Sequence, residues 1–188
     1  MTEGIVLAGG YASRMSQNKM MLPFAGKPLI AATIMRMRSS VDRIIIVTGH
    51  YHGAIASYFS EMSDITIVFN PDYDRGMFTS VQRGVQETKS DFFVTPGDYP
   101  LISENTYQSL IMAAGKIRVP VYQGRRGHPI FFDHTLKGLL LACDPSDNLK
   151  AFRDRYEVNY VDVDDPGVIQ DIDTPSDYHH LNRGGKPE

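Results

Sequence analysis

The chain has 188 residues, of which 42% are hydrophobic and 22% are charged, as in average globular proteins. Nineteen Lys and Arg against 22 Asp and Glu give a formal net charge of −3, which argues against a nucleic-acid partner. The single cysteine, Cys143, excludes an intramolecular disulfide and a zinc site built on several thiolates. No apolar run reaches the ~18 residues of a membrane span, and no basic signal-peptide region opens the chain. We therefore predict a cytoplasmic protein without a membrane partner, with one domain over residues 1–182 and a mobile tail over residues 183–188.

Short apolar runs alternate with longer segments of helical periodicity. The predicted strands are residues 4–8, 43–48, 65–69, 91–95, 119–122, 129–132 and 159–163. The predicted helices are residues 28–38, 52–61, 78–88, 104–116, 135–143, 148–156 and 175–181. The polar turn at residues 123–127 indicates a hairpin between two of the strands. This alternation predicts an α/β fold, a three-layer α/β/α sandwich around a mostly parallel, Rossmann-like sheet.

Ligands of such sheets bind at the carboxyl ends of the strands. After the first strand, Gly9 and Gly10 allow a sharp turn with exposed N–H groups, which suits an anion. Arg14 and Lys19 follow and add two cations, so the segment is typical of a polyphosphate grip. The alternative is a tight β-to-α connection with two solvated cations. Neither a P-loop nor the G-x-G-x-x-G pattern is present, which disfavours ATPases and classical dehydrogenases.

The sequence supplies carboxylates at two further loops. Asp98 follows the predicted strand 91–95, where a carboxylate beside a polyphosphate loop suits Mg²⁺. Asp173 is the best second ligand, because Asp171 and Asp173 alternate on one face. The alternatives are a turn-capping role for Asp98 and an N-cap role for Asp173, for which Thr174 competes.

Four ordered segments resemble one known family, the molybdenum cofactor nucleotidyltransferases with a GT-A-like fold. They are Leu7 to Lys19 with the following Leu22-Pro23 and Gly26-Lys27-Pro28-Leu29, then Gly97-Asp98-Tyr99-Pro100-Leu101, Gly124-Arg125-Arg126-Gly127-His128-Pro129, and Asp171-Ile172-Asp173-Thr174-Pro175-Ser176-Asp177-Tyr178. The third and fourth are similar to the cytidylyltransferase branch, whereas Leu7-Ala8-Gly9-Gly10 is similar to the guanylyltransferase branch. The resemblance implies that Arg14 and Lys19 neutralise a triphosphate and that Asp98 holds magnesium.

With this resemblance the candidate roles are as follows. Arg14, Lys19 and Asp98 are the catalytic candidates, and Asp98 and Asp173 are the metal ligands. The residues expected at the nucleotide are Leu7, Ala8, Gly9, Gly10, Ser13, Arg14, Lys19, Asn70, Gly76 and Ser80. Helix capping is the alternative role for Gly76 and Ser80.

Arg125, Arg126 and His128 are expected to bind the anionic acceptor, with a solvated hairpin turn as the alternative for the two arginines.

The predicted reaction moves CMP from CTP to the phosphate of molybdopterin, with Mg²⁺ as cofactor and release of pyrophosphate. The acceptor oxygen is already anionic, so catalysis needs alignment and charge neutralisation rather than a strong base. The alternatives are GTP as donor, a sugar phosphate or other phosphorylated acceptor, a non-catalytic NTP-binding protein and a nicotinamide-dependent oxidoreductase. Contact with a molybdoenzyme or a cofactor-insertion protein is a further hypothesis.

Overall fold

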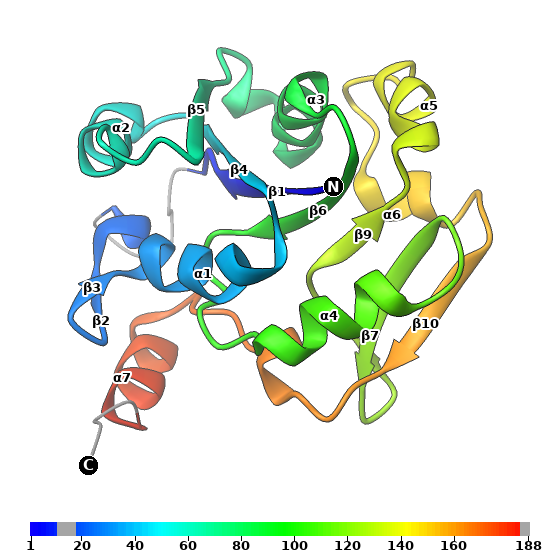
Figure 1. The fold of residues 1–188 in the computed structure, drawn as a ribbon. Helices are drawn as coiled ribbons and strands as arrows, with labels where there is room; N and C mark the ends of the chain where they lie inside the picture. The colour runs from blue at the N-terminus through cyan, green and yellow to red at the C-terminus, as the bar shows by residue number, and fades with distance from the viewer. Residues whose placement is uncertain (11–17, 185–188) are drawn as a thin grey trace.

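The computed structural model describes residues 1–10 and 18–184, with side chains as far as Leu181. An eight-stranded sheet runs through the centre in the order β10-β7-β9-β6-β1-β4-β5, with β8 paired to β7 (Figure 1). The strands are β1 (Thr2–Ala8), β4 (Arg43–Thr48), β5 (Ile65–Phe69), β6 (Asp91–Pro96), β7 (Ile117–Tyr122), β8 (Arg125–Arg126), β9 (Ile130–Phe132) and β10 (Val158–Asp162). A separate hairpin consists of β2 (Pro23–Phe24) and β3 (Lys27–Pro28).

The sheet is mostly parallel. β1 pairs in parallel with β4 and β6, β4 with β5, and β10 with β7, whereas β9 runs antiparallel between β6 and β7. Continuous apolar runs suit strands covered on both faces, and Ile44 to Val47 of β4 are at most 1% exposed. The carboxyl ends of β1, β4 and β6 therefore meet at one edge, where the loops of interest begin.

Helices cover both faces of the sheet, which confirms the predicted three-layer α/β/α class. One face packs against α3 (Met77–Glu87), α5 (Lys137–Leu141) and α6 (Leu149–Arg153). The other packs against α1 (Leu29–Met37), α2 (His52–Phe59) and α4 (Glu104–Met112). The last helix, α7 (Pro175–Gly184), lies beside the β2–β3 hairpin, where Tyr178 donates a hydrogen bond to the carbonyl of Pro23 (Figure 1).

Two strands have the predicted boundaries, and several helix ends deviate from them. The strands predicted at 43–48 and 65–69 are found at those residues. The helix predicted to reach residue 116 ends at Met112, because Ala113 is extended and Gly115 turns the chain with a φ of +95°. Pro28 was expected in the first turn of a helix but lies in β3, paired with Pro23, so α1 begins one residue later.

The predicted hairpin is present, but its second arm has an interruption. Val121 pairs with Arg126 in the hairpin, whereas Ile117 pairs with Phe132 farther along. Arg126 and Phe132 are thus six positions apart in the second arm, whereas their partners in β7 are only four positions apart. Two extra residues in one strand form a bulge, which commonly redirects a side chain. Here the bulge contains His128.

Within the described part of the chain, none of the helices is long and apolar enough to cross a membrane.

The packing of α3 on the sheet depends on a glycine. A Cβ on Gly84 would lie 2.6 Å from Ile5 Cγ2 and 2.9 Å from Val47 Cγ2, closer than carbon atoms pack. Gly84→Ala should therefore lower the free energy of unfolding by about 2 kcal/mol, as overpacked core variants do. Gly53→Ala is the matched control, because a Cβ there, on helix α2, has no atom within 4 Å. Urea titration of both variants measures the difference, and equal stability would contradict the close packing of α3.

Candidate active site

Three charged side chains meet at the carboxyl edge of the sheet. Lys19 begins the short 3-10 helix η1 (Lys19–Met21), Asp98 follows β6, and Asp173 precedes α7. Lys19 Nζ donates hydrogen bonds to Asp98 Oδ2 at 2.6 Å and to Asp173 Oδ1 at 3.1 Å. Lys19 and Asp98 are each only 8% exposed, so this ion pair is largely removed from water. The structure thus brings together three residues that the sequence analysis selected from three distant segments.

The corner that carries Asp98 is held by its neighbours. The amide of Gly97 donates to the carbonyl of Leu7 at 2.9 Å, and Thr33 Oγ1 donates to the carbonyl of Gly97 at 2.8 Å. A Cβ on Gly97 would lie 2.9 Å from Met20 Sδ and 3.3 Å from the Leu7 carbonyl. Glycine at this position therefore allows η1 to pack closely against the end of β6, which brings Lys19 within reach of Asp98.

Asp173 is positioned by a buried neighbour and is spared the capping role. Ile172 is fully buried, and its amide donates to the carbonyl of Asp98 at 3.0 Å. Thr174 and Asp177 cap α7 reciprocally: Asp177 Oδ2 accepts from the Thr174 amide at 2.8 Å, and Thr174 Oγ1 accepts from the Asp177 amide at 3.2 Å. Thr174 thus takes the capping role for which the sequence left Asp173 as an alternative.

A third carboxylate belongs to the same cluster. One oxygen from each of Asp98, Asp171 and Asp173 lies within 4.8 Å of the other two. Asp98 Oδ1 is buried and has no hydrogen-bond partner among the described residues. A buried carboxylate oxygen without a partner is costly, and three clustered carboxylates are ligands suited to a hard cation. The residues present therefore fit a divalent metal.

The charges in the cluster shift one another's pKa. Burial disfavours the Lys19 ammonium, but Asp98 and Asp173 outweigh burial and raise its pKa above the ordinary value. For Asp171, burial raises the pKa, and the charges of Asp98 and Asp173 add to this increase. The cluster thus contains three carboxylates and one ammonium in contact with two of them.

The glycine loop after β1 is described only in part. Leu7 and Ala8 are the last residues of β1 and are buried. Gly10 is exposed, and no atom of the described residues lies within 4 Å of a Cβ built on it. Gly9 is buried, and a Cβ on it would lie 3.0 Å from Ser80 Oγ. Of the two described glycines, Gly10 is exposed and Gly9 is buried. Two other predicted residues, Ser13 and Arg14, lie outside the described residues.

Asn70 and Ser80 support a loop rather than face an open surface. Asn70 Nδ2 donates to Thr79 Oγ1 and to Ser80 Oγ, both at 2.9 Å, and its Oδ1 accepts from the amide of Asp72 at 3.0 Å. Asn70 is 2% exposed and Ser80 3%. These polar groups bond one another inside the protein, and their direct contact with a nucleotide stays a prediction. Gly76 has a φ of +117° at the start of α3, a conformation that favours glycine.

The two predicted acceptor arginines face different surroundings. The positive charge of Arg125 acts on Tyr99, which follows Asp98. Arg126 instead stacks over the ring of Tyr160, with its Cζ 4.5 Å from the ring centroid. Neighbouring residues of a strand point to opposite faces, which accounts for this separation. The two arginines therefore lie in different surroundings, with the charge of Arg125 on the side of Tyr99, and their contact with an anionic acceptor stays a prediction.

His128 is half-buried, and its ring packs against a neighbouring aromatic side chain. Its ring lies edge-on to Tyr99 with centroids 4.8 Å apart, and its Nδ1 is buried without a hydrogen-bond partner among the described residues. Burial lowers the pKa of His128 to about 4, although the Asp98 charge and a hydrogen bond to Val94 oppose this. The imidazole is thus neutral near pH 7 and adds no positive charge to an acceptor site. Gly127 permits this packing, because a Cβ there would lie 2.2 Å from the carbonyl of Val168.

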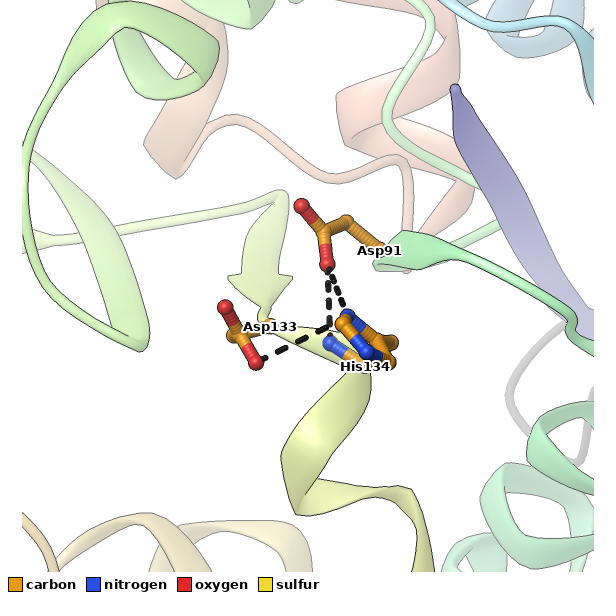
Figure 2. A group of neighbouring side chains, drawn as sticks. All are labelled: Asp91, Asp133 and His134. Atoms are coloured by element: carbon orange, nitrogen blue, oxygen red, sulfur yellow. Dashed lines mark hydrogen bonds and ion pairs between the residues drawn. The ribbon is translucent and has the colours of Figure 1, made fainter.

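A second group of acidic and histidine side chains lies at the opposite edge of the sheet. Figure 2 shows Asp91, Asp133 and His134 at the start of β6 and the end of β9. Asp91 Oδ1 accepts from the His134 amide at 2.9 Å, and Asp133 Oδ1 accepts from the Thr135 amide at 2.8 Å. The side chain of His134 is 61% exposed. These contacts cap the turn after β9 and explain why the three side chains gather there.

Comparison with known proteins identifies the family of the chain. A family model described as MobA-like NTP transferase domain matches residues 4–160. The chain belongs to this family. It is therefore a nucleotidyltransferase. The chain is 32% identical to the molybdenum cofactor cytidylyltransferase of Escherichia coli K12, over 93% of this chain and 92% of that protein. It is 28% identical to a probable molybdenum cofactor guanylyltransferase of Natranaerobius thermophilus, over 95% and 94% of the two chains.

A solved structure supports the same assignment. The crystal structure of a nucleotidyl transferase from Methanothermobacter superposes on the nucleotidyltransferase described here with a TM-score of 0.83 at 26% identity, covering 98% of this chain and 97% of that one. The family resemblance seen in the sequence is thereby confirmed. The alternatives of a non-catalytic NTP-binding protein and of a nicotinamide-dependent oxidoreductase are set aside.

Two features of this nucleotidyltransferase site were missed by reasoning from the sequence. Tyr99 was noted only as part of a motif, yet burial and the charges of Asp171 and Asp98 raise its pKa well above the ordinary value. Asp171 was noted only for its alternation with Asp173 and was not chosen as a ligand. That alternation was the available signal, because residues two apart on an extended segment point the same way.

The burial of His128 makes stability depend on pH. Its pKa is about 4 in the folded protein against 6.5 for an ordinary histidine. As the pH falls below about 6.5, the unfolded chain takes up a proton that the folded protein does not, so stability falls until the pH reaches about 4. From about pH 7.5 to about pH 5, His128 should cost about 2 kcal/mol of unfolding free energy.

His128→Gln should reduce this loss, because glutamine does not titrate and its Nε2 can replace the imidazole donor to Val94. Urea titrations at both pH values measure the difference, with His134→Gln as the control for an exposed imidazole. An identical acid dependence of His128→Gln and the wild type would show that the His128 pKa is not lowered by burial.

Proposed function

We propose that this nucleotidyltransferase moves CMP from CTP to the phosphate of a molybdopterin-type acceptor and releases pyrophosphate, with Mg²⁺ as its cofactor. The observation that carries the proposal is the meeting of Lys19 with Asp98 and Asp173 at the carboxyl edge of the sheet. A cation for phosphate oxygens and carboxylates for a metal are the two components that phosphoryl chemistry requires. The named relatives act on the molybdenum cofactor, which supports the acceptor class.

Asp98 and Asp173 would hold the metal, with Asp171 within reach of the same position. The support for this assignment is Asp98 Oδ1, which is buried and has no hydrogen-bond partner among the described residues. A bound Mg²⁺ supplies neutralisation of negative charge on phosphate oxygens. Magnesium commonly uses one or two carboxylates together with phosphates and water, so this small ligand set is sufficient.

The remaining roles belong to cations that position phosphates. Lys19 would bind the leaving pyrophosphate portion of the nucleotide, and Arg14, outside the described residues, would share this role. Arg125, on the side of Tyr99, would bind the acceptor phosphate. Because the acceptor oxygen is anionic from the start, no side chain has to remove a proton from it. The chain's residues thus act by alignment and by stabilising the charge on the leaving group.

CTP is the proposed donor. The closing segment 171–178 favours CTP, whereas Gly9 indicates GTP if a missing methyl enlarges the base pocket. The surroundings of Gly9 weaken that second indication: a methyl there would be directed at Ser80 Oγ, at 3.0 Å, rather than into open space. The relative with the higher identity is the cytidylyltransferase, at 32% against 28% for the guanylyltransferase.

Pyrophosphate release tests the proposal directly. The protein is assayed with CTP, GTP and ATP, each with and without molybdopterin, in the presence of Mg²⁺. We expect release that requires molybdopterin and a preference for CTP of roughly 10-fold or more in kcat/KM. A strong preference for GTP would overturn the choice of donor and keep the acceptor. Release that requires a sugar phosphate instead of molybdopterin would overturn the acceptor.

Asp98→Asn should remove turnover while the protein stays folded. Asparagine keeps the shape of the side chain but not the charge, so a decrease of roughly 1000-fold in kcat is expected for the loss of metal-based charge stabilisation. The matched control is Asp144→Asn, an exposed aspartate whose Oδ1 accepts from the amide of Ser146 and can be replaced there by an amide oxygen. Circular dichroism checks the fold. A near-normal rate of Asp98→Asn at saturating Mg²⁺ would refute the metal assignment.

A further inference from the structure

The ammonium of Lys19 lies where the proposed metal would bind. Lys19 Nζ is 2.6 Å from Asp98 Oδ2 and 3.1 Å from Asp173 Oδ1, which are short contacts to both proposed metal ligands. The exposed fractions of these side chains are 9% for Lys19, 12% for Asp98 and 33% for Asp173. A magnesium ion bound to the same two oxygens would lie about 2.1 Å from each. An ammonium and a metal ion therefore cannot occupy the space between these two oxygens together.

We propose that Lys19 is the resident cation of the free protein and that tight binding of the metal requires the nucleotide. In this inference, which rests on the proposed function, Lys19 neutralises Asp98 and Asp173 until a triphosphate offers it other anionic oxygens. Its movement to the phosphates frees both carboxylates for the metal. Nucleotide and metal then bind with positive coupling, and each raises the affinity for the other by the same factor.

The metal could also bind to Asp98 Oδ1, which has no hydrogen-bond partner among the described residues. The positive charge of Lys19 disfavours this arrangement. A metal bound there while Lys19 keeps Oδ2 would place a divalent ion and an ammonium on one buried carboxylate. Like charges at such a distance repel strongly where water is largely excluded. Lys19 therefore lowers the metal affinity of the free protein in either arrangement, by occupying the ligands or by repelling the ion.

An effect of Lys19 on metal binding can be distinguished from simple binding of the metal to the nucleotide phosphates. Nucleotide phosphates bind metal by themselves, so a nucleotide would raise the affinity for a metal with or without a role for Lys19. The distinguishing quantity is the affinity for the metal in the absence of nucleotide, compared between the wild type and a variant without the ammonium. Lys19→Met keeps the length and apolar stem of the side chain and removes the charge.

The experiment uses Mn²⁺ alone as the probe, with free Mn²⁺ read by electron paramagnetic resonance. The full chain is titrated as wild type, Lys19→Met, Lys19→Gln and the control Lys150→Met, which removes an exposed lysine. Without nucleotide, Lys19→Met and Lys19→Gln should bind Mn²⁺ roughly 10-fold or more tighter than the wild type, because a repelling charge in contact with the ligands is gone. Lys150→Met should match the wild type, and adding Asp98→Asn to Lys19→Met should abolish the gain.

A labelling measurement on the wild type keeps the inference testable if both Lys19 variants unfold. Acetylation of Lys19 by a small reagent, followed by peptide mass analysis, should be slow in the free protein, where Asp98 and Asp173 hold the ammonium. Labelling should become faster in saturating Mn²⁺ alone, because the metal displaces the ammonium from the carboxylates. Labelling that stays slow at saturating Mn²⁺ would overturn the inference.

The outcomes separate this inference from the proposed function. Equal Mn²⁺ affinity of the wild type and the Lys19 variants without nucleotide would overturn the role of Lys19 and leave the metal assignment intact. Absence of Mn²⁺ binding by every protein, even with the CTP analogue, would overturn the metal site itself and with it the proposed reaction.

Discussion

A buried carboxylate requires a cation, and this requirement organises the edge of the sheet. Asp98 is only 8% exposed, so its charge is stable only when a cation or donors compensate it. Lys19 supplies this compensation to one of the two oxygens. The glycine before Asp98, the short helix that carries Lys19 and the buried Ile172 before Asp173 all serve to bring the opposite charges into contact. Removal of either partner would leave an uncompensated buried charge, so this contact constrains three segments at once.

The parallel sheet explains why residues from distant segments can share this contact. β1 lies between β4 and β6, and the three run in the same direction, so the chain leaves each of them at one edge. The loop after β1 leads to Lys19, and the corner after β6 carries Asp98. The third segment does not come from a neighbouring strand: it crosses the edge as residues 171–173 and is joined to the corner by the Ile172 amide. The family's chemistry is thus placed by the direction of strands, not by nearness in the sequence.

The sequence was informative where a single physical pattern decides the structure. The strand at 43–48 could be predicted to the residue, because a continuous apolar run has few alternatives in a sheet covered on both faces. The strand at 65–69 could be predicted because β-branched and aromatic residues favour a strand, although it lies at the edge of the sheet. Lys19, Asp98 and Asp173 could be chosen from the sequence because charged residues in the loops of such a sheet are candidates for binding phosphate or metal. The burial of His128 could not be predicted, because it depends on two extra residues between β8 and β9 and on a glycine against Val168. Likewise the polar pattern of Asn70 and Ser80 suits a ligand equally well, and only the fold shows that they bond each other.

Charge balance gives the site its order of events. The cluster of Asp98, Asp171 and Asp173 contains up to three negative charges and is in contact with one ammonium. A nucleoside triphosphate adds several more negative charges, so its approach to this cluster is repulsive unless cations arrive with it. Burial raises the pKa of Asp171, and the negative charges of Asp98 and Asp173 raise it further. His128 contributes no compensation near neutral pH, since burial keeps it uncharged. Under the proposed function, a divalent metal bound to the nucleotide would therefore have two effects. It would bring positive charge to the carboxylates, and it would allow Lys19 to exchange carboxylate oxygens for phosphate oxygens without leaving Asp98 uncompensated.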